Sequence, residues 1–213
     1  MKLVNFASLD PSITSTGRRG LGNASRADKA IWDEFNEDWE SLAIESEMHL
    51  KGLIKKRGGV PTGLNLALDN SDDADYEGQT KSIQINARIK QSFFRKTVLS
   101  SYGGRCCVTR ISERRLLVAS HIVPWKADAK IRLNPRNGLC LSALHDKAFD
   151  RGLITITDDF KVDVSPALSN YEKEPFIRDN LIAIRGQAIA LPEKFRPDMK
   201  FLRRHREMWM DTK

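Results

Sequence analysis

The first half of the chain has two stretches in which apolar residues recur at helical spacing. The first predicts an amphipathic helix over about 26–50, with its apolar stripe at Ile31, Phe35, Trp39 and Leu42. The second predicts a helix over about 82–101, in which apolar rows begin at Ile85 and Phe94. Gly103 and Gly104 follow directly and are typical of a helix end.

Beyond residue 105 the apolar runs become short and are separated by Gly, Pro and paired Asp, which predicts strands and turns. The expected order is strand, loop, strand and short helix, then two hairpins and a terminal helix. The corresponding ranges are 116–122, 138–141, 143–150, 153–157 with 161–164, 181–184 with 188–191, and 198–210. The expected fold class is therefore α+β.

Residues 60–80 combine Pro, Gly and Asn with an acidic cluster, which is typical of a surface loop or linker. We therefore expect a helical region with a linker over 1–81. A second domain is expected over 82–213, with its core at about 105–165.

The charge distribution favours a polyanionic partner. The net charge is +7 and the isoelectric point is about 9.4. Residues 26–50 carry two basic and eight acidic side chains, whereas residues 82–115 carry eight basic and one acidic. A gathered basic charge can neutralise phosphates and release their counterions, although a solvated helix face would have the same composition.

Cysteine usage and hydropathy indicate an intracellular protein. Cys106, Cys107 and Cys140 are odd in number and include a vicinal pair, so we expect reduced, packed thiols. No C-x-x-C pair is present to build a four-thiolate zinc site. The apolar runs are too short for a membrane span and no secretory signal is visible at the start of the chain, so a cytoplasmic location is expected.

Two histidines and an asparagine stand at the junctions of the central elements. His121 ends the first strand in A-S-H-I-V-P-W, Asn137 opens the second in N-P-R-N-G-L, and His145 lies in the first helical turn in H-D-K-A-F-D-R-G. We expect a hairpin with a helix across it to bring both imidazoles to one cleft. A neutral imidazole can take a proton from water, an amide can hold a loop, and a cation can stabilise phosphorane charge.

These motifs resemble those of the His-Asn-His nuclease family, and most closely its bacterial restriction-type subgroup. The motif match covers about 35 residues. The resemblance implies a ββα-metal core that hydrolyses phosphodiester bonds in DNA, with double-stranded DNA favoured. It also implies that His121 is the general base, Asn137 the orienting residue and His145 a metal ligand.

Two positions depart from the family pattern. Ser120 stands where many relatives carry Asp or His, and Phe149 stands where others carry a second helical His. Asp146 and Asp150 are the nearby carboxylates, although neither shares the helix face of His145. Any of these oxygen-bearing side chains could be the second ligand. Mg²⁺ is favoured, Mn²⁺ or another divalent ion remains open, and no structural zinc is expected.

Basic residues surround the motif and are candidates for phosphate contacts, or simply solvate the loop. They include Lys126, Arg132, Arg136, Lys147 and Arg151. The resemblance suggests a role in restriction or defence against foreign DNA, and double-strand cleavage from one active site suggests a homodimer. The alternatives are a non-catalytic nucleic-acid-binding protein and a nuclease that an unidentified partner activates.

Overall fold

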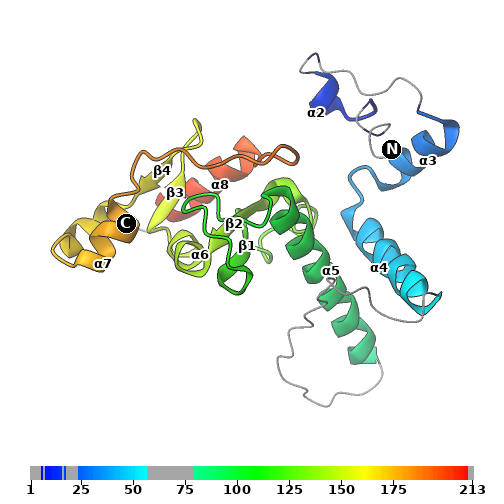
Figure 1. Ribbon diagram of the computed structural model, residues 1–213, viewed down its shortest axis with the longest axis horizontal. Coiled ribbons are helices and arrows are strands. Elements are labelled where there is room, and N and C mark those ends of the chain that lie inside the picture. The colour runs from blue at the N-terminus through cyan, green and yellow to red at the C-terminus, as the bar shows by residue number, and fades with distance from the viewer. Residues whose placement is uncertain (1–5, 7, 16, 18–23, 57–78, 211–213) are drawn as a thin grey trace. The chain divides into compact units, whose positions relative to one another are not determined.

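The computed structural model describes residues 6, 8–15, 17, 24–56 and 79–210, and the chain divides into two compact units, 1–89 and 90–213 (Figure 1). Within the described residues, no helix has both the length and the apolar character that crossing a bilayer requires. The elements are α2 (Pro11–Thr14), α3 (Arg26–Phe35), α4 (Trp39–Lys56), α5 (Gln79–Ser101), η1 (Arg114–Leu116), β1 (Leu117–His121), η2 (Pro135–Asn137), β2 (Gly138–Ser142), α6 (Ala143–Asp150), β3 (Ile154–Ile156), β4 (Val162–Val164), η3 (Pro166–Tyr171), α7 (Pro175–Ile177), η4 (Arg178–Ile182) and α8 (Met199–Met210).

In the first unit, the single helix expected over 26–50 is two helices. Ser25 caps α3 reciprocally with Asp28: the Ser25 hydroxyl accepts from the Asp28 amide, and the Asp28 carboxylate accepts from the Ser25 amide. The helix ends because Glu37 has a φ of 76°, which an α-helix does not allow. The Asp38 carboxylate then accepts from the Ser41 amide and starts α4.

In the second unit, the expected strand, loop, strand and helix form the centre of the fold. β1 and β2 pair antiparallel, from Leu117 opposite Ser142 to His121 opposite Gly138. Ser142 also caps α6, because its hydroxyl accepts from the His145 amide. α6 therefore begins where β2 ends and contacts both strands (Figure 1).

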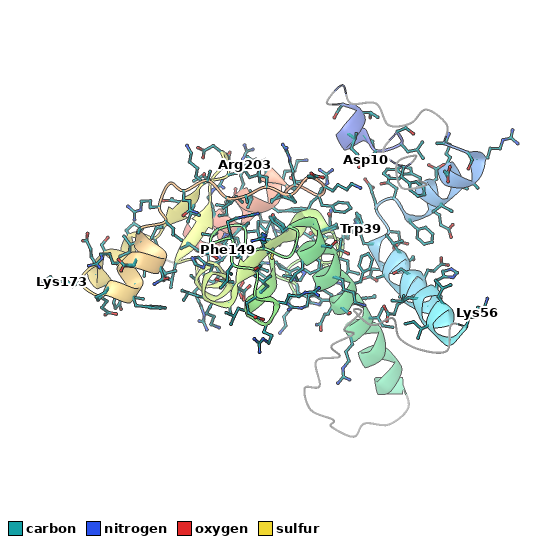
Figure 2. The ribbon with its side chains drawn as sticks, viewed as in Figure 1. Asp10, Trp39, Lys56, Phe149, Lys173 and Arg203 are labelled. Carbon is teal, nitrogen blue, oxygen red and sulfur yellow. The ribbon has the colours of Figure 1, made fainter. Side chains whose placement is uncertain are left out.

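Helix α5 packs closely against the start of β2. A Cβ built on Gly138 would lie 2.4 Å from Val98 Cγ2 and 3.0 Å from Phe94 Cζ, so only glycine fits there without displacing α5. Phe94 and Val98 are both buried. They belong to a core that also contains Leu117, Leu139, Leu141, Phe149 (labelled in Figure 2), Ile154, Ile156 and Leu202.

Of the two hairpins expected after α6, only the first is present. β3 and β4 pair from Ile154 opposite Val164 to Ile156 opposite Val162. The second prediction is wrong, because 178–182 forms a π-helical turn and 186–189 instead lies beside β4. There, Val162 exchanges hydrogen bonds with Gly186 and Gln187, and the Ile189 amide donates to the Phe160 carbonyl. Within this segment, Ile189 is buried.

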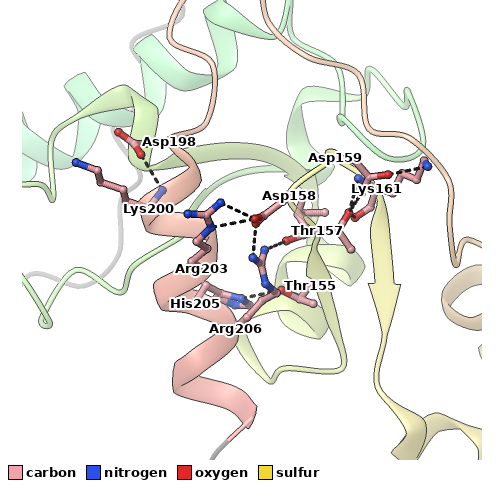
Figure 3. Close-up of polar contacts among 11 residues, drawn as sticks. Thr155, Thr157, Asp158, Asp159, Lys161, Asp198, Lys200, Arg203, His205 and Arg206 are labelled. Atoms are coloured by element: carbon pink, nitrogen blue, oxygen red, sulfur yellow. Dashed lines mark hydrogen bonds and ion pairs between the residues drawn. The ribbon is translucent and has the colours of Figure 1, made fainter.

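The terminal helix α8 uses its basic run to bind the protein itself. Figure 3 shows the Arg203 and Arg206 guanidinium groups donating to the Asp158 carboxylate in the β3–β4 turn. Arg204 forms an ion pair of 3.2 Å with Asp128, in the loop between β1 and β2. α8 is thereby tied to the β3–β4 turn and to the loop between β1 and β2.

The three cysteines have free thiols and are buried, as expected. Cys106 Sγ accepts from the backbone amides of Thr109, at 3.4 Å, and of Ser142, at 3.3 Å. Cys106 therefore packs against the end of β2.

Candidate active site

His121 ends β1, and one hydrogen bond defines its tautomer. Its Nε2 lies 2.9 Å from the Arg132 carbonyl oxygen, which can only accept, so Nε2 carries the hydrogen. Among the residues that the structure describes, this carbonyl is the one hydrogen-bond partner of the ring. Nδ1 is therefore the nitrogen with a lone pair that can accept a proton.

Two aromatic rings enclose the His121 imidazole. Phe94 of α5 stacks on it, with ring centroids 3.8 Å apart and an interplanar angle of 11°. The Trp125 ring lies perpendicular to it, with ring centroids 5.4 Å apart and an interplanar angle of 88°. Burial lowers the pKa of His121 below its ordinary value, outweighing the Arg132 carbonyl and the Asp146 charge, which raise it. The lowered pKa therefore favours the neutral ring, which is the form that can accept a proton.

Asn137 clamps the chain immediately after His121. Its side chain is fully buried. Oδ1 accepts from the Val123 amide at 2.8 Å, and Nδ2 donates to the Val123 carbonyl at 3.0 Å. The Asn137 carbonyl also accepts from the Ile122 amide at 2.9 Å. This geometry suits the orienting role that the sequence suggested, because these bonds set the path of the two residues that follow the imidazole.

A cavity of about 330 Å³ opens beside His121. It holds one carboxylate, from Asp150, and two cationic side chains, from Lys147 and Arg151. The remaining lining residues are Ile122, Pro124, His205 and Trp209. An imidazole, a carboxylate and two cationic side chains therefore line one cavity.

Asp146 and Asp150 lie four residues apart in α6, a spacing that places both on one helix face. Burial, followed by the nearby charge of Asp146, raises the pKa of Asp150. The same Asp146 charge acts on His121, so the carboxylate pair belongs to the His121 side of α6. In the described part of the chain, no three His, Cys, Asp or Glu side chains are grouped to hold an ion. Two carboxylates with water and substrate oxygens nevertheless suit Mg²⁺.

His145 does not share this cavity, and the expectation that the two imidazoles meet is corrected. Its ring is 2% exposed. Nδ1 lies 2.7 Å from Ser142 Oγ and Nε2 lies 3.2 Å from the Asn180 carbonyl, so both ring nitrogens are hydrogen-bonded within the protein. Asp146, the next residue along α6, is turned by about 100° relative to His145. The carboxylates can therefore face His121 while His145 points into the η4 segment.

Ser120 is also directed away from His121. Successive side chains of a strand point to opposite faces, and Ser120 stands opposite Leu139 while His121 stands opposite Gly138. The Ser120 hydroxyl is buried and has no hydrogen-bond partner among the described residues. This position does not suit a metal ligand shared with Asp150.

The candidate phosphate-binding residues are only partly brought together. Lys147 and Arg151 line the cavity. The Arg132 guanidinium lies over the Trp125 ring, 5.1 Å from its centroid. Lys126 is exposed on the same loop, and Arg136 is half-buried. Unlike Lys147 and Arg151, the residues Lys126, Arg132 and Arg136 do not line the cavity.

Sequence reasoning missed the contribution of α8 to this cavity. His205 stacks on Phe149 at 3.7 Å, and its Nε2 donates to the Phe149 carbonyl at 3.1 Å. Trp209 packs against the backbone of Gly152. The helical spacing of His205 and Trp209 was the available signal, because it put both residues on one face.

Comparison with known proteins identifies the central segment. Residues 106–157 match a family described as HNH endonuclease, which confirms the resemblance expected from the motifs. None of the curated proteins matches the chain. Among solved structures, one match is described as "Modification dependent TagI restriction endonuclease". It has 22% sequence identity and a TM-score of 0.40, and the match covers 54% of this chain and 36% of that chain.

Proposed function

We propose that this chain, whose residues 106–157 form an HNH endonuclease domain, hydrolyses phosphodiester bonds in double-stranded DNA with the aid of a divalent metal ion. The observation that carries the proposal is the cavity that gathers His121, Asp150, Lys147 and Arg151. The nuclease domain is assigned to 82–213.

His121 acts as the general base. Its Nε2 hydrogen is committed to the Arg132 carbonyl, so Nδ1 accepts the proton of the attacking water. General-base assistance of this kind contributes roughly a hundredfold to ten-thousandfold in rate. Asn137 supports the base indirectly, because it holds Val123 in place two residues beyond the imidazole.

Asp146 and Asp150 would hold the metal ion, for which Mg²⁺ is favoured and Mn²⁺ is an alternative. When bound, such an ion supplies positive charge that stabilises the phosphorane and the leaving 3′ oxygen. This assignment replaces His145 and Ser120 as ligands. It is supported by the i, i+4 spacing of the two carboxylates and by the exposure of Asp150 to the cavity.

Lys147 and Arg151 would bind the oxygens of the scissile phosphate or of a neighbouring one. Both side chains reach the cavity from α6 and its end, beside the carboxylates. Two cations beside two carboxylates suit a bound phosphate. The cations would bind its oxygens directly, and the carboxylates would hold a metal ion next to it. The products would be 5′-phosphate and 3′-hydroxyl ends.

Plasmid cleavage tests the function. Purified protein is expected to nick or linearise supercoiled plasmid with Mg²⁺ or Mn²⁺, and EDTA is expected to stop the reaction. His121→Ala should abolish cleavage with circular dichroism unchanged. Asp146→Asn and Asp150→Asn should raise the Mg²⁺ concentration for half-maximal rate. Asp179→Asn is the matched control, because Asp179 is exposed and paired with Arg178. Intact plasmid with every metal tried would refute the proposal.

The proposed biological setting is restriction or defence against foreign DNA, as the motif resemblance suggests, and the proposed location is the cytoplasm. A homodimer would bring two cavities to the two strands, and light scattering of the purified protein tests it. The competing function is nucleic-acid binding without cleavage, which is favoured because the described residues contain no group of three His, Cys, Asp or Glu side chains that could hold a metal. It predicts salt-sensitive DNA binding by a wild-type protein that leaves DNA intact.

A further inference from the structure

Phe94 lies outside the family match, yet it makes the closest aromatic contact to the proposed base. It belongs to α5, twelve positions before the matched segment 106–157 begins. Its ring lies nearly parallel to the His121 imidazole, at 3.8 Å and 11°. The Phe94 side chain is 2% exposed, so the surrounding core fixes the orientation of its ring.

One hydrogen bond does not fix an imidazole. The His121 ring is joined to the chain through its Cβ–Cγ bond, and the hydrogen bond from Nε2 to the Arg132 carbonyl anchors its far side. Within the tolerance of that hydrogen bond the ring can still rotate about the Cβ–Cγ bond, and such rotation would move Nδ1. The parallel ring of Phe94, at 3.8 Å, and the perpendicular ring of Trp125, at 5.4 Å, restrict this motion.

The stack is built into the fold by neighbouring contacts. Gly138, the strand partner of His121, has no side chain, and the space that a Cβ would need is taken by Phe94 and Val98. The absence of a side chain at Gly138 therefore lets α5 approach the end of β1. The sequence places an aromatic ring at this position of the helix.

We propose that Phe94 is a positioning residue for catalysis, whose ring holds the His121 imidazole so that Nδ1 faces the attacking water. The proposal rests on the nuclease function proposed above. Displacing a catalytic group by about 1 Å can cost roughly a hundredfold in rate. Loss of the stack should therefore lower kcat. The affinity for DNA should stay the same, because it depends on cationic side chains elsewhere in the cavity.

The test compares variants that keep or remove the ring. Phe94→Leu and Phe94→Met keep an apolar side chain and remove the stacking face. They are expected to lower kcat about 10- to 100-fold, with KM for DNA within about twofold of the wild type. Phe94→Tyr keeps the ring and should retain most of kcat. Thermal unfolding of each variant sets an assay temperature at which all are folded.

Val98→Ala is the matched control. Val98 lies one turn further along α5, is fully buried, and also packs over Gly138, but it does not stack on the imidazole. It should cost comparable stability and change kcat by less than about threefold. If Phe94→Leu and Val98→Ala lower kcat equally, or if Phe94→Leu raises only KM, the positioning role is refuted while the nuclease function stands. A wild type that cannot cleave DNA refutes both.

Nuclear magnetic resonance gives a readout independent of activity. The Phe94 ring current should shift the carbon-bound protons of the His121 imidazole upfield in the wild type and in Phe94→Tyr. The shift should disappear in Phe94→Leu and persist in Val98→Ala. An unshifted imidazole in the wild type would overturn the stacked geometry on which the proposal depends.

Discussion

The Asn137 side chain offers a direct test of how the loop after His121 is held. Asn137→Ala removes an acceptor and a donor from the amide and carbonyl of Val123, at 2.8 and 3.0 Å. Both residues are fully buried, so no water reaches the abandoned groups. Leaving a buried backbone group unpaired costs about 1–3 kcal/mol, and two such groups amount to about 2–6 kcal/mol. That is a large share of the roughly 5–15 kcal/mol that stabilises a typical domain.

The assay is urea unfolding at pH 7, followed by tryptophan fluorescence and compared with Asn170→Ala. Asn170 is exposed, and its substitution should change the unfolding free energy by less than about 0.5 kcal/mol. Asn137→Asp is a sharper variant, since it keeps the acceptor but turns the donor into an oxygen that faces the Val123 carbonyl. Its stability should recover partly at low pH, where a protonated carboxyl can donate again. A loss below about 1 kcal/mol in Asn137→Ala would refute the clamp.

Three further predictions concern other buried groups. Burial lowers the pKa of His205 to about 4 from 6.5. This contribution to stability is therefore complete above pH 6.5 and is lost as the pH falls towards 4, by roughly 3 kcal/mol; unfolding of wild type and His205→Gln across that range measures it. His145→Leu should lower the unfolding free energy and leave the Mg²⁺ dependence of cleavage unchanged; a raised Mg²⁺ requirement would restore His145 as a ligand. Gly138→Ala should destabilise by about 1–3 kcal/mol, because its Cβ would overlap Val98, and a thermal melt no lower than that of the wild type would contradict the close packing of α5.

Local signals in the sequence were sufficient for the elements that carry the chemistry. The strand, loop, strand and helix, with Ser142 capping α6, follow from patterns within about 35 residues. The position of His121 at the end of β1 was legible for the same reason, whereas Asn137, expected to open the second strand, ends η2 directly before β2. The i, i+4 spacing of Asp146 and Asp150 was equally visible in the sequence. For the proposed metal site, this spacing matters more than the position of either carboxylate relative to His145.

Contacts between distant residues decided what the sequence could not show. His145 turns away because the Asn180 carbonyl, 35 residues later, accepts its Nε2 hydrogen. The expected second hairpin does not form, because residues 186–189 instead hydrogen-bond to the backbone of Phe160 and Val162 at the edge of β4. The basic run of α8 resembled a phosphate-binding face, yet Arg203 reaches Asp158, 45 residues earlier. No local periodicity contains this information.

The dependence of the cavity on α8 has a consequence for the order in which the protein becomes active. A ribosome makes the chain from its N-terminus, so 106–157 emerges about 40 residues before the helix that bears His205 and Trp209. During that interval the Phe149 carbonyl lacks its imidazole donor, and Asp158 lacks both arginines. The nascent polypeptide thus contains every motif residue without a completed cavity. Under the proposed function, cleavage would therefore begin only after α8 has been made and has docked.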